Sequence, residues 1–214
     1  MNRLSYVCVI AALLAGVGCS SQSAEQGGEP SGEKASAAKG MKAPSNFESI
    51  EGEEARSRAI FEEMGRALKH PRCVNCHPAG DRPLMGEESE PHQPLVERGK
   101  GGFGPPGMRC TTCHNNENYK NVPGRPGWHM APREMAWEGK SLAEICEQIK
   151  DPERNGGKSI DGIVEHIATD NLVAYGWEPP DQYEAVPGSQ DLLGKLARAW
   201  ADSGAHCPEV SATP

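Results

Sequence analysis

The sequence has few of the residues that build a hydrophobic core. Only 36% of its 214 residues are hydrophobic and 5% are aromatic, whereas a globular domain usually contains about 45–50% apolar residues. Glycine and proline are abundant instead, with 25 and 18 residues. A chain of this composition needs a source of order besides its own core, such as a disulfide or a large apolar cofactor.

Positive charge and strand patterns are also scarce. The chain has 22 Lys and Arg against 30 Asp and Glu, a net charge of −8. This balance argues against nucleic acid as a partner, because phosphates require a basic surface, and it permits docking to a basic protein. The alternation of apolar and polar residues that marks a β-strand is nearly absent. The composition therefore favours a helical protein that binds other proteins or a cofactor.

The N-terminus has the pattern of an export signal. Arg3 precedes an apolar run at residues 6–17, which is too short for the roughly 20 apolar residues of a transmembrane helix. The run ends before Cys19 in a context that resembles a bacterial lipoprotein cleavage site. Residues 1–18 would then be removed, and Cys19 would carry the lipid. Gly16 stands where this site usually has an aliphatic residue, which leaves an ordinary signal peptide as the alternative.

The remainder of the chain divides by composition. Residues 19–50 begin with the lipidated Cys19 and continue as a stretch rich in Ser, Gly, Ala, Glu and Lys, which is typical of a flexible linker. Residues 51–208 are of the length of one domain, and residues 209–214 form a tail. Ser20, with no acidic residue beside it, favours the outer membrane. We therefore expect a periplasmic protein that reaches the membrane through an N-terminal lipid anchor.

Four of the eight cysteines form two CxxCH motifs. The motifs are Cys73-Val-Asn-Cys76-His77 and Cys110-Thr-Thr-Cys113-His114. A CxxCH motif attaches haem c, because its two thiols add to the haem vinyl groups and the adjacent histidine binds the iron as proximal ligand. The sequence thus predicts two covalently bound haems, with His77 and His114 as the proximal ligands.

Zinc binding and a redox-active CxxC are the competing interpretations of these cysteines. A gap of 33 residues separates Cys76 from Cys110, whereas the two pairs of a zinc ribbon are about 15–20 residues apart. A thioredoxin-like motif requires a βαβ setting, and no strand pattern flanks either pair. The spacing therefore favours haem over both alternatives.

Two further cysteines, Cys146 and Cys207, remain in the predicted domain. Leftover cysteines of an exported protein usually pair, because the compartment is oxidising. We predict a disulfide between Cys146 and Cys207 that ties a helix to the C-terminal tail. The alternative is two free thiols.

Helix signals recur along the predicted domain. Residues 53–69 place apolar side chains on one face at helical spacing, and residues 141–150 begin with a serine cap and a glutamate three positions later. Residues 159–169 and the segment from Ser189 to Gly204 show the same kind of stripe and cap. Long Gly- and Pro-rich loops separate these segments. We predict an all-α, c-type cytochrome-like dihaem domain with long loops.

The sixth iron ligand of each predicted haem decides between electron transfer and catalysis. His92 follows His77 by fifteen residues, and His129 follows His114 by the same interval. This weak internal repeat predicts the ligand pairs His77/His92 and His114/His129, although the distal pair could be crossed between the haems.

Other side chains compete for these roles. The rival distal ligands are Met130, Met135, His166 and Met85. For His166, a position inside an apolar helix face makes a satisfied core histidine the common outcome. Arginines near the motifs are candidates to bind haem propionates, with exposure to solvent as the alternative; they are Arg72, Arg82, Arg98 and Arg109.

Residues 58–208 resemble a family of small bacterial dihaem c-type cytochromes that are often labelled isoquinoline 1-oxidoreductase subunits. The segments that carry the resemblance are CVNCHPAGDRPLMG, RCTTCHNNEN, WHMAPREMAWEGKS, ICEQIKDPERNGG and GAHCP. The resemblance implies periplasmic electron transfer beside a dehydrogenase of the molybdenum-hydroxylase type. The chain itself has no molybdopterin or iron–sulfur motif, so it is not expected to be the catalytic subunit.

The leading functional hypothesis is a two-haem electron carrier rather than an enzyme. Such a carrier would accept electrons from a dehydrogenase and pass them to a respiratory cytochrome or oxidase. The alternatives are a dihaem peroxidase-like enzyme and a haem-based ligand sensor. Both alternatives require an open or weakly held axial position on one iron.

Overall fold

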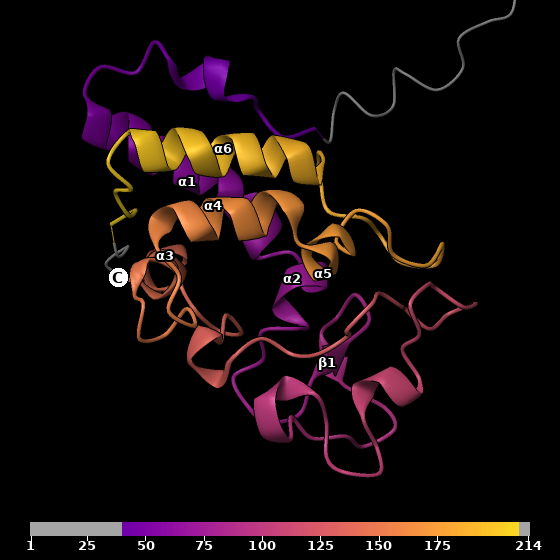
Figure 1. The fold of residues 1–214 in the computed structure, drawn as a ribbon. Helices are drawn as coiled ribbons and strands as arrows, with labels where there is room; N and C mark the ends of the chain where they lie inside the picture. Colours follow the sequence, from indigo (N-terminus) through magenta and orange to yellow (C-terminus); the bar gives the residue numbers. More distant parts are fainter. Residues whose placement is uncertain (1–39, 210–214) are drawn as a thin grey trace, which may run out of the picture.

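The computed structural model describes residues 40–209 (Figure 1). The predicted signal peptide, the lipidation site at Cys19 and most of the predicted linker lie outside these residues. The helices are α1 (Glu53–Leu68), α2 (Pro71–Val74), α3 (Leu142–Lys150), α4 (Ile160–Thr169), α5 (Asn171–Ala174) and α6 (Gln190–Asp202). Short 3-10 turns lie at Pro44–Phe47, Lys100–Gly102, Cys110–Thr112 and Arg133–Met135. The two short strands β1 (Leu84–Met85) and β2 (Glu90–Pro91) pair antiparallel.

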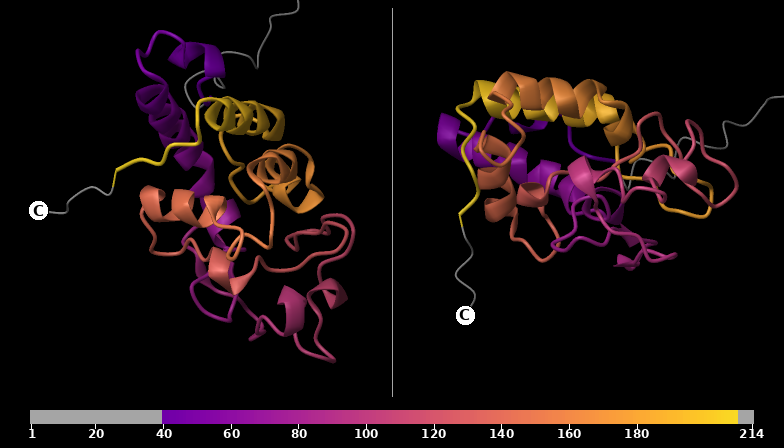
Figure 2. Two further views of the ribbon diagram at one scale, coloured as in Figure 1. Left: turned by 60° about the vertical axis from the view of Figure 1, so that its left-hand side comes forward. Right: turned by 60° about the horizontal axis from the view of Figure 1, so that its bottom comes forward.

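The molecule has a helical part and a part built of loops. Helix α6 packs against both α1 and α4, and Figure 1 shows these three helices stacked together. The long segment between α2 and α3 gathers on one side of this stack, as both views of Figure 2 show. The described residues are thus mostly helical, as the sequence predicts, and the loops form a region of their own.

The core of the helical part lies between α1 and α6. The rings of Phe61 and Trp200 lie 5.1 Å apart at their centroids, and both side chains are fully buried. Ile60, Met64 and Leu196 complete the contact between the helices. The apolar stripes of the sequence therefore face one another in the fold, which is the usual way in which amphipathic helices bury their surface.

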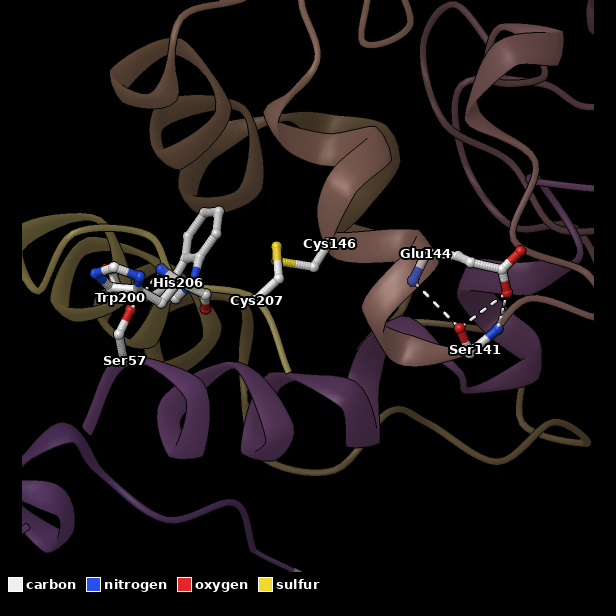
Figure 3. Close-up of a disulfide and its surroundings, with 7 residues drawn as sticks. All are labelled: Ser57, Ser141, Glu144, Cys146, Trp200, His206 and Cys207. Carbon is white, nitrogen blue, oxygen red and sulfur yellow. Dashed lines mark hydrogen bonds between the residues drawn. A yellow bond between two sulfur atoms is a disulfide. The ribbon is translucent and has the colours of Figure 1, made fainter. Parts of the chain in front are cut away.

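Local capping signals place the helix starts. Ser141 accepts a hydrogen bond from Glu144 N, while the Glu144 carboxylate accepts one from Ser141 N, which is a complete capping box (Figure 3). Ser159 and Ser189 cap α4 and α6 through their side chains, which accept hydrogen bonds from Gly162 N and Leu192 N. The predicted helix starts are confirmed, because each cap satisfies amide groups that have no partner inside the helix.

A disulfide ties the C-terminal segment to α3. The sulfur atoms of Cys146 and Cys207 are bonded at 2.04 Å (Figure 3). Trp200 donates its Nε1–H to His206 O at 3.0 Å, and His206 N donates to Ser57 Oγ at 2.9 Å. The segment after α6 is thereby fastened to α1 and α3.

The loop region is held by buried polar contacts rather than by regular structure. Arg98 is 7% exposed, and its guanidinium donates to the carbonyl oxygens of Ala131 and Gly80. Gly102 has φ +82°, and a Cβ there would meet Met130 O. A glycine is therefore required where these two loop segments approach each other. Within residues 40–209, no helix is long and apolar enough to cross a membrane.

Candidate haem-binding site

Each CxxCH motif lines its own cavity. Cys73, Cys76 and His77 line one cavity of about 270 Å³. Cys110, Cys113 and His114 line a second one, also of about 270 Å³. We call them the first and the second cavity. Their volumes lie near the lower end of the roughly 300–1,000 Å³ of common small-molecule pockets, so each is a candidate binding site.

The first motif begins on a short, well-defined helix. The Nδ1 atom of His70 accepts a hydrogen bond from Arg72 N at 3.2 Å, and Pro71 occupies the first turn of α2. The ring of His77 stacks on Trp137, with centroids 3.6 Å apart and planes 7° apart. His77 Nδ1 donates to Met135 O at 2.7 Å. The imidazole is thus fixed both in orientation and in tautomer.

The second motif repeats this arrangement on a 3-10 turn at Cys110–Thr112. The ring of His114 stacks on Trp128, with centroids 4.6 Å apart and planes 8° apart. His114 Nδ1 donates to Pro123 O at 2.7 Å. In both motifs a tryptophan and a main-chain carbonyl therefore hold the histidine of the motif.

The hydrogen bonds of these histidines suit metal ligation. A histidine that binds a metal usually donates its other ring N–H to a carbonyl or carboxylate, and here Nδ1 of both His77 and His114 does so. The lone pair is then left on Nε2. Burial lowers the pKa of His77 to about 4 and also lowers the pKa of His114. Both rings are therefore neutral near pH 7, the form that binds metal.

His92 lies beside His114, not beside His77. The two ring centroids are 5.8 Å apart, and His92 lines the second cavity. The position of His92 favours pairing with His114, an arrangement that the sequence leaves open, over the predicted pair His77/His92. His92 directly follows the β1–β2 hairpin, in which Leu84 pairs with Pro91. The Nδ1 atom of His92 donates to Pro94 O at 3.0 Å, which again leaves Nε2 free to bind a metal.

His166 lines the same cavity as His77. It lies on α4, lines the first cavity together with Ile163 and Ile167, and contributes to the lowered pKa of His77. Its Nδ1 lies 3.2 Å from Asp170 Oδ2. His166 thus has a partner in Asp170, but it is not a core histidine, because its side chain is 39% exposed and lines a cavity.

His129 lies on the wall between the two cavities and lines both. Its Nδ1 donates to Gly127 O at 2.6 Å, and its ring stacks on Phe103 with centroids 4.6 Å apart. The predicted pair His114/His129 therefore stays a prediction, with His92 as a second histidine near His114. Trp128, the residue before His129, stacks on the ring of His114.

The methionines take different places. Met130 lines the second cavity and Met135 the first, and both are nearly buried. The carbonyl of Met135 accepts the hydrogen bond from His77, so its backbone lies beside the proximal ring. Met85 lines the second cavity, where its sulfur accepts a hydrogen bond from Gln93 N at 3.1 Å. In each cavity a second histidine therefore competes with a nearby methionine.

The thiols of the first motif are unlike those of a redox-active pair. Burial raises the pKa of Cys73 to about 12 and that of Cys76 to about 11, whereas redox-active CxxC motifs lower the pKa of a cysteine. Zinc binding also requires thiolates. Among residues 40–209, no group of three or more His, Cys, Asp or Glu side chains gathers as a metal cluster.

The two cavities share a wall. Four residues line both of them: Arg72, Cys76, Trp128 and His129. The Nε atom of Arg72 and the indole Nε1 of Trp137 are buried without a hydrogen-bond partner. Such atoms are costly to bury, so they are sites where a polar group of a bound cofactor would be accepted.

Comparison with known proteins gives no match: no family model, no curated protein and no solved structure matches the chain. The site therefore rests on its own geometry. Sequence reasoning did not find the two tryptophans that stack on the proximal histidines. A signal that could have suggested Trp128 is its place directly before His129 in a proline-rich loop.

Proposed function

We propose that the chain is an electron carrier that holds two c-type haems covalently, in a c-type cytochrome-like domain. The observation that carries the proposal is the repeated constellation in the two cavities. Each cavity combines a CxxCH motif, a second histidine near the proximal one, and Nδ1 bonds that leave Nε2 on each ring. One such site could arise from a structural cluster, whereas two of the same composition favour a common cofactor.

The residues fit the attachment chemistry of haem c. The S–H bond of each motif cysteine adds across a vinyl C=C bond, so that sulfur bonds to one carbon and hydrogen to the other, with no leaving group. Cys73 and Cys76 would attach one haem, and Cys110 and Cys113 the other. When bound, the haem iron supplies reversible one-electron chemistry. His77 and His114 would hold the irons from the proximal side.

The second histidine in each cavity would favour electron transfer over catalysis. A strong sixth ligand blocks the position at which a peroxidase binds its substrate or a sensor its gas. His166 would fill this position in the first cavity and His92 in the second. The shared wall keeps the two sites adjacent, which favours electron exchange between them. The donor would be a dehydrogenase and the acceptor a respiratory cytochrome or oxidase, with a lipid at Cys19 as the periplasmic anchor.

The test is the absorption spectrum of the full chain matured by a cytochrome c assembly system, with covalent haem quantified against protein. Two haems per chain, low-spin in both oxidation states and without a sulfur-to-iron charge-transfer band, are expected. The matched variants Cys73→Ser with Cys76→Ser, and Cys110→Ser with Cys113→Ser, should each retain one haem. Absence of covalent haem would refute the proposal. Carbon monoxide binding to one reduced haem in the unaltered protein would favour the enzyme or sensor.

A further inference from the structure

Arg72 occupies an unusual place for a charged side chain. It precedes Cys73 of the first motif, and it is only 3% exposed. The sequence leaves solvent exposure open for this residue, and the structure excludes it. Its side chain lines both the first and the second cavity. A permanent positive charge therefore lies at the wall that the two candidate haem sites share.

The protein satisfies this guanidinium only in part. Nη2 donates to Gly86 O at 2.6 Å and lies 3.1 Å from Glu87 Oε2. The guanidinium also forms a hydrogen bond with the Tyr175 side chain, and its carbon lies 4.7 Å from the centre of the Tyr183 ring. Only Nε is buried without a hydrogen-bond partner. Glu87 is 38% exposed and also accepts a hydrogen bond from Glu184 N. One donor of this buried charge thus remains without an acceptor, and such a donor is costly to bury.

Burial alone does not distinguish Arg72. Arg98 is also buried, but it lines neither cavity, and its guanidinium holds the carbonyl oxygens of Ala131, Gly80 and Pro78. Arg98 therefore has a structural role inside the loop region. The Nε atom of Arg98 also lacks a hydrogen-bond partner, so the difference lies in the cavities. Only Arg72 places a buried guanidinium with an unpartnered donor on the wall of both cavities, and this placement points to an anionic group entering from a cavity.

We propose that Arg72 binds haem propionate at the shared wall and that its charge raises the reduction potentials of both haems. The inference rests on the proposed function, since the propionates belong to the haems. An arginine suits this role because its planar fork of donors matches a carboxylate. A positive charge near both irons favours the reduced, less positive state of each. One residue thus adjusts two redox centres in the same direction.

The experiment is a potentiometric titration of the full, haem-loaded chain. The variant Arg72→Gln removes the charge, and Arg72→Lys keeps it without the fork. Arg198→Gln, on the exposed face of α6, is the control for a change in net charge away from the cavities. At an effective dielectric of about 20, loss of one nearby buried charge should lower the electron affinity of each haem roughly tenfold, which corresponds to about 59 mV for one electron.

A second variant, expected to shift the reduction potentials in the opposite direction, makes the test independent of Arg72→Gln. Glu87→Gln removes the counter-charge of Arg72, so both potentials should rise, and this holds even if Arg72→Gln does not fold. Arg72→Lys should recover most of the potential that Arg72→Gln loses. If the haem-loaded variants keep both reduction potentials unchanged, or if only one haem shifts, the proposal for Arg72 is refuted. The proposed function is then unaffected. An unaltered protein without covalent haem would overturn the proposed function as well.

Discussion

The proposed assignment of His166 to the first haem and His92 to the second makes a sharp prediction about single-haem variants. With Cys110→Ser and Cys113→Ser, the protein would retain only the haem of the first motif. In that background His166→Ala should leave the iron without its sixth ligand, whereas His92→Ala should leave it unchanged. In the reciprocal background, which lacks the thiols of the first motif, the effects of the two alanine variants should be exchanged.

The expected fraction of high-spin haem follows from the separation of the histidine rings. Two metal–nitrogen bonds of about 2 Å each, together with the distances from nitrogen to ring centre, separate the centroids of two axial imidazoles by about 6 Å. The rings of His92 and His114 are 5.8 Å apart, close to this separation without any haem bound. In the two-haem protein, each single alanine variant should therefore convert half of the haem to the high-spin form. In each single-haem background, replacing the assigned histidine should convert all of the haem to the high-spin form, and replacing the other histidine should convert none.

The assay is absorption spectroscopy of the oxidised protein, followed by carbon monoxide titration of the reduced protein. His129→Ala is the matched control, because His129 lines both cavities but is assigned to neither iron. It should leave both haems low-spin. If His129→Ala rather than His166→Ala opens the first haem, or if His92→Ala opens it, the pairing inferred from the structure is refuted.

Three further predictions concern stability. The Cys146–Cys207 bond spans 61 residues, so replacing both cysteines by alanine should lower the free energy of unfolding by about 4 kcal/mol; a loss below about 1 kcal/mol in urea denaturation would contradict this loop-entropy argument. Gly102→Ala should lower the melting temperature more than Gly107→Ala: both have positive φ, which costs about 1–2 kcal/mol, but only Gly102 also faces a carbonyl oxygen. Equal effects would show that this contact is unimportant. Hydrogen bonds from a lysine and from the helix cap lower the pKa of Glu144 to about 2, so its stabilisation is present above about pH 4.5 and is lost as the pH falls toward 2. The difference in unfolding free energy between the unaltered protein and Glu144→Gln should shrink over that range, and a constant difference would contradict the assignment.

The helices were predictable because their signals are local. Ser141 with Glu144 three residues later forms a capping box both in the sequence and in the structure, and Ser159 and Ser189 cap their helices at the predicted positions. A cap depends on atoms within one turn of helix. The apolar stripes that follow these caps are equally local, since they need only the helical period.

The distal histidines could not be paired from sequence, because pairing depends on how loops return. His92 and His129 follow their motifs at the same interval, yet a hairpin carries His92 to the other motif, while His129 reaches the wall between the cavities. His166 comes to His77 from a separate helix, and only the packing of α4 beside the first cavity brings it there. Equal spacing determines how long a loop is, but it does not determine toward which motif the loop returns.

The repetition in the structure lies on the proximal side of each site instead. His77 stacks on Trp137 and donates to a main-chain carbonyl, and His114 does the same with Trp128 and another carbonyl. The two tryptophans are at very different distances along the chain from their histidines, so no spacing rule relates them. A common physical requirement does: a metal-binding imidazole must be held in one tautomer and one plane. Two unrelated loops meet that requirement with the same contacts, which argues that both motifs serve the same kind of ligand.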